Sequence, residues 1–279
     1  MEDEPAAQTV VFAAHHDAAR GGLVFHPGPT RWVADTFPRW YDRQETSPPL
    51  MRLVVAGPLL AAAGAALGLP AMRRAGGGMA LLTALAMADI ATRPVAPGAN
   101  DNLAAVAVLL ELARLLREAP PPGVRILLLS TGSEESLLEG MRGFLARHAA
   151  ALDPARTRFV VLECVAGPEA ILLEGEGMLR LRDYPAWMRD WLAGCAERAG
   201  HPLRRRLRTG LATDALPALR RGYPAAVLAS IDRYKMAPHY HSPADVAANA
   251  HFGTTAAVCA VCLEAARSLS SRAPAPAPA

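Results

Sequence analysis

Four short apolar runs along the chain alternate with longer segments in which apolar residues recur every three or four positions. The short runs are continuously apolar and cover residues 9–14, 124–130, 158–165 and 225–230. The helical periodicity covers residues 101–117, 136–151, 184–199, 212–221 and 252–268. Continuous apolar strands are typical of a parallel sheet that is covered on both faces. Their alternation with helices predicts an α/β fold with a mostly parallel mixed sheet sandwiched by helices.

Residues 21–96 interrupt this alternation and are predicted to form an insertion. Its first part contains the aromatic-rich stretch "RWVADTFPRWYDR", and its second part is strongly apolar. Two apolar segments, residues 53–72 and 75–92, flank an arginine pair at 73–74; the first segment carries no charge and the second carries one. Apolar segments joined by a basic turn predict a helical hairpin within residues 51–92.

The environment of this hairpin is left open by the sequence. About 20 apolar residues cross a bilayer, and the first segment reaches that length, although Pro58 and many small residues weaken it. Residues 51–92 therefore either associate with a membrane or are buried against the domain or a second subunit, and the oligomeric state stays undetermined. The acidic start "MEDEPAAQ" is unlike a signal peptide, so we expect a membrane-associated or a cytoplasmic protein.

The remaining segments are predicted to form one domain. We expect this domain to comprise residues 1–20 and 97–271, and the Pro-Ala tail at 272–279 to be disordered. Because the first strand begins almost at once, an N-terminal part of the domain is expected to be missing.

Composition narrows the classes of partner. The chain has 279 residues, of which 52% are hydrophobic, so it can bury a large core. The net charge is +3, and the one basic cluster, "LRRRLR" at 203–208, is too short to indicate nucleic-acid binding. Four cysteines do not make a disulfide framework in a chain of this length. Cys259 and Cys262 lie in an apolar helical run and are interpreted as core residues.

Ligand-type side chains follow the predicted strands at the points where those strands end. His15 comes after the first strand, Glu134 and Glu135 after the second, and Glu163 after the third. In α/β sheets, ligands bind beyond the carboxyl ends of the strands. We therefore expect these side chains to meet at one site, together with Asp101 at the start of the next helix.

Two histidines and several carboxylates form a nitrogen and oxygen donor set that suits zinc, manganese or cobalt, with zinc the first choice. Two ions of a co-catalytic site lie about 3.5–4 Å apart and share a water. One carboxylate can bridge them, and a free carboxylate must accept the proton of the water. The stretch "GANDN" supplies the bridging candidate, Asp101, which we also expect to cap the helix behind it.

The order of these motifs resembles the M28 family of zinc aminopeptidases. The motifs are HxD at 15–17, GANDN at 98–102, EE followed by LLEGMRGF at 134–144, the acidic strand end at 163, and YHSPAD at 240–245. The resemblance covers residues 9–20 and 97–268 but not 21–96. It implies two zinc ions held by five ligands: His15, Asp101 as the bridge, Glu135, Glu163 and His241.

The same resemblance implies three catalytic residues. Glu134 matches the general base, Asp17 matches the carboxylate that orients His15, and Tyr240 matches a tyrosine that stabilises the oxyanion in some members. Two departures stand out. Glu163 replaces the usual aspartate and is one methylene longer, and a large insertion separates the first histidine ligand from Asp101.

The implied function is a zinc-dependent exopeptidase, in the first place an aminopeptidase that hydrolyses peptide substrates. Two other classes remain open. A glutaminyl-cyclase-like acyltransferase uses the same scaffold with one zinc and without the HxD ligand, so the intact His15 and Asp17 argue against it. A non-catalytic interaction domain would have lost ligands, and every ligand position here holds a competent residue. Asp214 is predicted either to cap a helix or to line the pocket, whereas His16, His239 and Asp245 are assigned no role.

Overall fold

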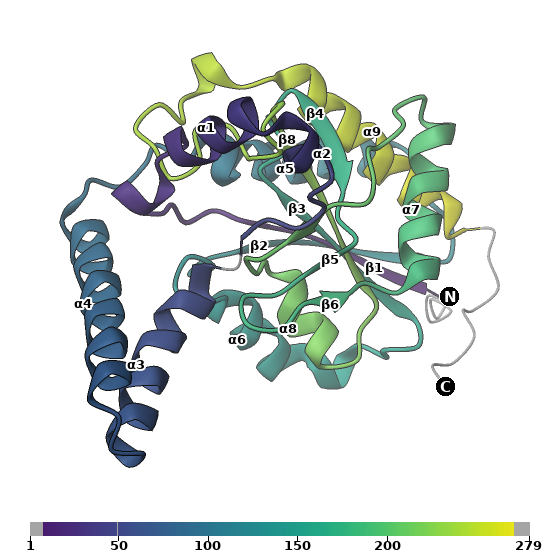
Figure 1. The fold of residues 1–279 in the computed structure, drawn as a ribbon. Helices are drawn as coiled ribbons and strands as arrows, with labels where there is room; N and C mark the ends of the chain where they lie inside the picture. The colour runs from purple at the N-terminus through teal and green to yellow at the C-terminus, as the bar shows by residue number, and fades with distance from the viewer. Residues whose placement is uncertain (1–7, 49, 271–279) are drawn as a thin grey trace.

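The computed structural model describes residues 8–48 and 50–270 (Figure 1). Its main sheet has five strands in the order β2-β1-β3-β8-β4. The first four are mutually parallel and β4 runs antiparallel to β8. The strands are β1 (Gln8–His15), β2 (Val124–Thr131), β3 (Thr157–Glu163), β4 (Glu169–Leu172) and β8 (Ala225–Ile231). The predicted mostly parallel mixed sheet is confirmed, and the tail expected at 272–279 lies outside the described residues.

Helices cover both faces of this sheet (Figure 1). One layer contains α5 (Ala104–Glu118), α7 (Ala186–Arg198) and α9 (Phe252–Ser268), and the other contains α6 (Glu139–His148) and α8 (Ala215–Arg220). Because β1 lies inside the sheet between the two layers, all eight of its residues are buried. This explains its continuously apolar sequence. By contrast, β2 is an edge strand and is only partly buried.

The helices of the domain occur where the sequence predicted them, but some begin or end at other residues. The last helix has the predicted bounds, and Cys259 and Cys262 are buried in it as expected. Helix α5 begins at Ala104, three residues later than predicted, because Asp101 and Asn102 have non-helical backbone angles. Short connecting 3₁₀ helices occur at Ala149–Ala151 and Ala247–Asn249.

A second, small sheet was not predicted. It has the order β6-β5-β7, with β5 (Gly175–Glu176), β6 (Arg182–Asp183) and β7 (Arg208–Thr209). Strands of two residues have no detectable period, so the hydrophobic pattern gives no signal for them.

The described residues within 21–96 form five helical elements. They are η1 (Leu23–Phe25), α1 (Gly28–Thr36), α2 (Pro38–Asp42), α3 (Leu50–Ala66) and α4 (Pro70–Thr92). The first three were not predicted. Helices α3 and α4 lie side by side as a hairpin that projects from the body of the molecule (Figure 1). Only 6% of the most apolar 18-residue stretch of α4 is buried, so the hairpin is not packed against the domain.

Candidate active site

The parallel register of the sheet brings the strand ends together. His15 is the last residue of β1 and pairs with Thr131, the last residue of β2. Glu163 ends the neighbouring strand β3. The loop after β2 carries Glu134 and Glu135. Residues that are far apart in the chain therefore share one edge of the sheet, as the positions of the polar residues predicted.

Asp101 lies in an irregular helical turn, Ala99–Leu103, between Gly98 and α5. Its side chain makes no capping hydrogen bond in the described structure, and Leu103 occupies the N-cap position of α5. The expectation that Asp101 caps the helix is therefore wrong, because its non-helical backbone turns the carboxylate away from the helix end. Both carboxylate oxygens are buried and have no hydrogen-bond partner among the described residues.

The two asparagines beside Asp101 fix this turn to the sheet. Asn102 donates from Nδ2 to the carbonyl of Leu162 at 2.8 Å and accepts from the backbone N–H of Cys164 at 3.0 Å. Asn100 accepts from the backbone N–H of Ala166 at 2.7 Å. Polar residues crowd this segment because the turn is buried and must satisfy the backbone of β3 and of the loop that follows it.

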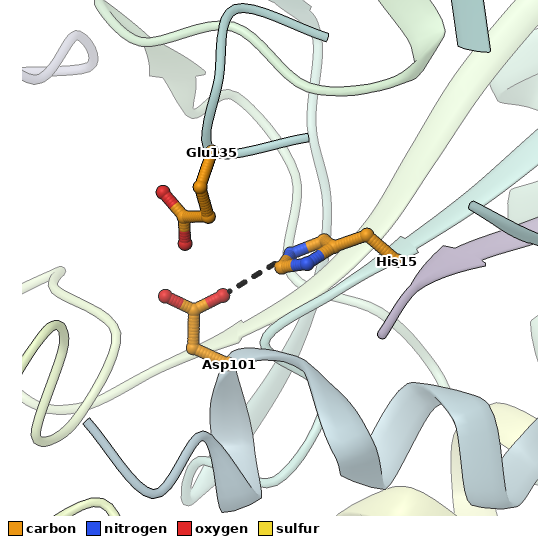
Figure 2. Close-up of side chains that lie close together, drawn as sticks. All are labelled: His15, Asp101 and Glu135. Atoms are coloured by element: carbon orange, nitrogen blue, oxygen red, sulfur yellow. Dashed lines mark ion pairs between the residues drawn. The ribbon is translucent and has the colours of Figure 1, made fainter. Parts of the chain in front are cut away.

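Two sets of donor atoms converge on the carboxylate of Asp101. On one side, Nε2 of His15 lies 3.3 Å from Oδ1 of Asp101 and 3.5 Å from Oε1 of Glu163. On the other side, Nε2 of His241 lies 3.3 Å from Oδ2 of Asp101 and 3.2 Å from Oε1 of Glu135. Figure 2 shows the side chains of His15, Asp101 and Glu135 pointing toward one another. Each oxygen of Asp101 thus belongs to a different set.

These separations fit metal ligands. Zinc bonds to nitrogen and oxygen are about 2.0–2.2 Å long, so neighbouring ligand atoms of a tetrahedral ion lie about 3.3 Å apart. The tautomer of His15 also fits, because its Nδ1 donates to the backbone carbonyl of Asp17 at 3.0 Å and leaves Nε2 with a free lone pair. The donor atoms present can therefore hold two ions with Asp101 between them.

Asp17 contacts both the histidine and the Glu134–Glu135 segment. Its Oδ1 lies 3.5 Å from Nδ1 of His15. Its two carboxylate oxygens accept the backbone N–H groups of Glu134 and Glu135, each at 3.1 Å. Sequence reasoning assigned Asp17 only the orientation of His15. The structure adds that it clamps the loop that carries both glutamates.

Acidic side chains outnumber basic ones in the site. Burial, followed by the charge of Glu163, raises the pKa of Glu134 to about 10. Burial alone would lower the pKa of His241, but Asp101 and Glu135 raise it to about 9. Likewise, burial opposes protonation of His15, yet the charge of Glu163 and bonds to carboxylates raise its pKa overall. So many buried carboxylates favour bound cations, which release protons from the histidines when they bind.

Two aromatic rings pack around His241. Tyr240 stacks on the imidazole with ring centroids 3.8 Å apart, and Phe25 lies edge-on to it at 4.3 Å. Burial, together with the nearby carboxylates, keeps the pKa of the Tyr240 phenol well above its ordinary value, so its hydroxyl stays a hydrogen-bond donor. Phe25 comes from η1 in the insertion, and no sequence signal indicated that it reaches the site.

Asp245 is a second residue whose role sequence reasoning missed. Its buried carboxylate accepts the backbone N–H groups of Asn100 at 2.7 Å and Asp101 at 3.0 Å. It therefore holds the turn that presents Asp101. The signal was present in the sequence, because Asp245 ends the YHSPAD motif and buried aspartates commonly accept loop N–H groups.

Asp214 is buried at the start of α8. It occupies the N-cap position of α8, but its side chain makes no capping bond in the described structure and instead accepts the hydroxyl of Thr131. Burial raises its pKa to about 6, and the charges of His15 and Glu163 also act on it. Asp214 thus lies beside the strand ends that carry the donor atoms.

Comparison with known proteins identifies a family and a fold. The family model described as "Peptidase family M28" matches residues 83–270. The LapA aminopeptidase of Legionella pneumophila has a TM-score of 0.60 at 13% identity, over 97% of this chain and 52% of that chain. For BSAP, a zinc aminopeptidase from Bacillus subtilis, the TM-score is 0.55 at 16% identity, over 95% of this chain and 47% of that chain.

A glutaminyl cyclase from Bacteroides thetaiotaomicron shares the fold as well, with a TM-score of 0.56 at 15% identity, over 94% of this chain and 73% of that chain. No curated protein matches the chain. The chain spans about half the length of the two aminopeptidase structures. At these identities the similarity establishes a zinc-exopeptidase-like fold.

Proposed function

Because the chain belongs to peptidase family M28, we propose that it is a zinc-dependent exopeptidase that acts as an aminopeptidase on peptide substrates. The observation that carries this proposal is the position of Asp101. Its two oxygens each lie 3.3 Å from the Nε2 atom of a different histidine, and neither oxygen has a hydrogen-bond partner among the described residues. A buried carboxylate placed in this way is suited to bridge two cations.

Each proposed ion has its own donors in addition to the shared Asp101. His15 and Glu163 would hold the first ion, and His241 and Glu135 would hold the second. The longer side chain of Glu163 still brings Oε1 to 3.5 Å from Nε2 of His15. When bound, such a zinc pair lowers the pKa of a shared water and polarises the carbonyl group of the substrate.

Glu134 is the proposed proton acceptor. Its backbone is fixed by Asp17, and its carboxylate takes part in neither donor pair around Asp101 among the described residues. Bound cations would offset the burial and the neighbouring carboxylates that raise the pKa of Glu134, so its ionised carboxylate could take a proton from water and pass it to the leaving amine. The protonated hydroxyl of Tyr240 is available to donate to the developing negative charge of the carbonyl oxygen.

A glutaminyl-cyclase-like acyltransferase is the second candidate, because a glutaminyl cyclase has this fold at a TM-score of 0.56. A one-zinc enzyme needs a single donor set. In such an enzyme the donor set of His15 and Glu163, which lies next to Oδ1 of Asp101, would bind no metal ion. A non-catalytic domain would need neither set, and buried carboxylates without partners would only destabilise it.

Metal content and product analysis of the full chain test this assignment. We expect about two zinc ions per chain and release of the free amine from a panel of amino-acid anilides. His15→Ala should lose one ion and the hydrolytic activity. His16→Ala is the matched control, because the exposed His16 bonds only to Ser130 Oγ among the described residues and should retain both. One zinc ion together with cyclisation of an N-terminal glutaminyl peptide would establish the acyltransferase instead, and absence of metal would refute both activities.

A further inference from the structure

The α3–α4 hairpin exposes apolar side chains around its whole circumference. Only Gly57, Gly64 and Gly76 are buried among the described residues of the two helices. Large apolar side chains of both helices are exposed: Leu53, Val55, Leu59, Leu81, Leu82, Leu85 and Met87. A helix that is apolar on all sides is found in a protein core or in a membrane. The hairpin projects from the body (Figure 1), so the core of this domain does not enclose it.

The charges of the hairpin are confined to its two ends. At the tip, Arg73 and Arg74 lie in the first turns of α4. At the root, Arg52 donates to the carbonyl of Leu179, and Asp89 pairs with Arg93 at 2.6 Å. No charged residue lies between the root and the tip on either helix. This distribution matches a lipid bilayer, which has polar surfaces and an apolar interior.

The length of the hairpin allows it to reach deep into a bilayer. Helix α4 has 23 residues and is long and apolar enough to cross a membrane. The uncharged part of each helix, residues 53–66 and 75–88, is about 21 Å long at 1.5 Å per residue. The hydrocarbon core of a bilayer is about 30 Å thick. Long arginine side chains at the tip extend this reach toward the far head groups.

The two helices pack closely against each other. A Cβ atom placed on Gly76 would lie 2.3 Å from the backbone nitrogen of Ala61, and one on Gly57 would lie 2.7 Å from that of Ala80. The backbones are therefore in direct contact, as small residues allow between membrane helices. A second copy could cover one face of such a pair, whereas lipid covers all of it. We propose that the α3–α4 hairpin is embedded in a lipid bilayer and anchors the catalytic domain to it.

The anchor is joined closely to the active site. Asp89 accepts the backbone N–H of Leu23 in η1, and a Cβ atom on Gly22 would lie 2.6 Å from the side chain of Ile90. Phe25, which follows Leu23 by two residues in η1, packs on the ring of His241. The root of the hairpin thus fixes the catalytic residues close to the membrane surface. Peptides that lie at a membrane surface are the substrate class favoured by this arrangement, a consequence that rests on the proposed function.

Vesicle flotation of the purified full chain tests the anchor without relying on catalysis. The vesicles contain phosphatidylcholine and about one quarter phosphatidylglycerol. We expect the chain to float with them and to stay bound in about 1 M NaCl, which screens surface charge but not burial in lipid. Leu82→Glu with Leu85→Glu should lower the bound fraction at least ~10-fold, because a charge in the bilayer interior is costly.

A matched substitution separates lipid embedding from general surface effects. Leu82 and Leu110 are each 69% exposed, but Leu110 lies on α5 of the catalytic domain. Leu110→Glu should therefore leave flotation unchanged. Release of the wild-type chain by salt would mean a purely electrostatic contact and would overturn the proposal. A chain that stays in solution as a dimer, and becomes monomeric with the two glutamates, would identify a second copy as the occupant and overturn it too.

Thiol labelling gives an independent readout. All four native cysteines are buried, so a single thiol at the exposed tip can be followed in Ala71→Cys. A membrane-impermeant maleimide should label this variant in detergent, and labelling should fall at least ~10-fold in vesicles because lipid excludes the reagent. Equal labelling in detergent and vesicles would show that the tip stays outside the bilayer.

Discussion

The ring of Phe25 packs edge-on against the imidazole of His241, with centroids 4.3 Å apart and an interplanar angle of 67°. The first residue belongs to the insertion and the second to the motif that supplies a proposed zinc ligand. The insertion therefore contributes to the wall of the proposed active site.

Replacing Phe25 should loosen His241. We expect Phe25→Ala to weaken retention of the ion held by His241 and Glu135 and to reduce turnover by about 10-fold, because a neighbour that orients a metal ligand is typically worth 10–100-fold. Zinc content after dialysis and anilide hydrolysis measure the two effects. Phe37→Ala is the control, since Phe37 is exposed and its ring packs on Trp32. Unchanged zinc retention in Phe25→Ala would limit Phe25 to a structural role.

Asp101→Ala should remove both ions, because this residue is shared by the two donor sets. Single-ligand variants such as His241→Ala should retain one ion at limiting zinc. Zinc analysis by mass spectrometry distinguishes the two patterns, and Asp190→Ala on the surface of α7 serves as the control. An Asp101→Ala protein that still carries about two zinc ions would refute the bridge.

Glu134 and Glu135 should differ in phenotype although they are neighbours in sequence. Glu134→Gln keeps the shape of the side chain and removes the proton acceptor, so turnover should fall at least ~10²-fold while zinc remains bound. Glu135→Gln should instead weaken zinc binding, because its Oε1 lies 3.2 Å from Nε2 of His241. If Glu134→Gln instead lost zinc and Glu135→Gln kept zinc but lost turnover, Glu135 would be the proton acceptor and Glu134 the metal ligand.

The clustering of the candidate residues could be predicted from the sequence because they lie at strand ends. His15 and Glu163 follow continuous apolar strands, and a parallel sheet places such ends together. The pattern could not show how Asp101 is held. A helical period behind it suggested a cap, whereas the structure uses a non-helical turn whose backbone bonds to Asp245. This contact joins residues 144 positions apart, and local periodicity carries no information about it.

The insertion, too, could be predicted from the sequence only in part. Its apolar composition indicated a hairpin, and two helices occupy residues 50–66 and 70–92. The short helices α1 and α2 were missed because an aromatic-rich segment gave no clear period. The contact between Phe25 and His241 depends on how the chain folds back after the hairpin, through Asp89 and Leu23, and only the three-dimensional arrangement reveals it.

Asp245 should act through Asp101 rather than on substrate. Asp245→Ala leaves the buried N–H groups of Asn100 and Asp101 without their acceptor, so the turn should lose its fixed position. We expect zinc affinity to fall about 10–100-fold, as for other residues that orient metal ligands. Competition with a chromophoric chelator measures the affinity. Excess zinc should then restore much of the activity in Asp245→Ala but none in Glu134→Gln, and failure of this rescue would argue for a direct catalytic role.

Glu176 offers a test of stability away from the metal ligands. It is fully buried in β5, accepts the backbone N–H of Thr213, and burial raises its pKa to about 8. At low pH the carboxyl is neutral in both the folded and the unfolded chain. As pH rises from about 4.5 to about 8, the unfolded chain ionises first, so this group progressively lowers the free energy of unfolding.

Glu176→Gln removes this ionisation while keeping an acceptor for Thr213. The variant should therefore gain stability relative to wild type at about pH 8.5, on the order of 3 kcal/mol, and gain little at about pH 4.5. Denaturant unfolding at both pH values measures the difference. Glu139→Gln, at the exposed start of α6, controls for the loss of one negative charge and should show no such pH dependence. An equal effect of Glu176→Gln at both pH values would show that the buried carboxyl does not couple folding to pH.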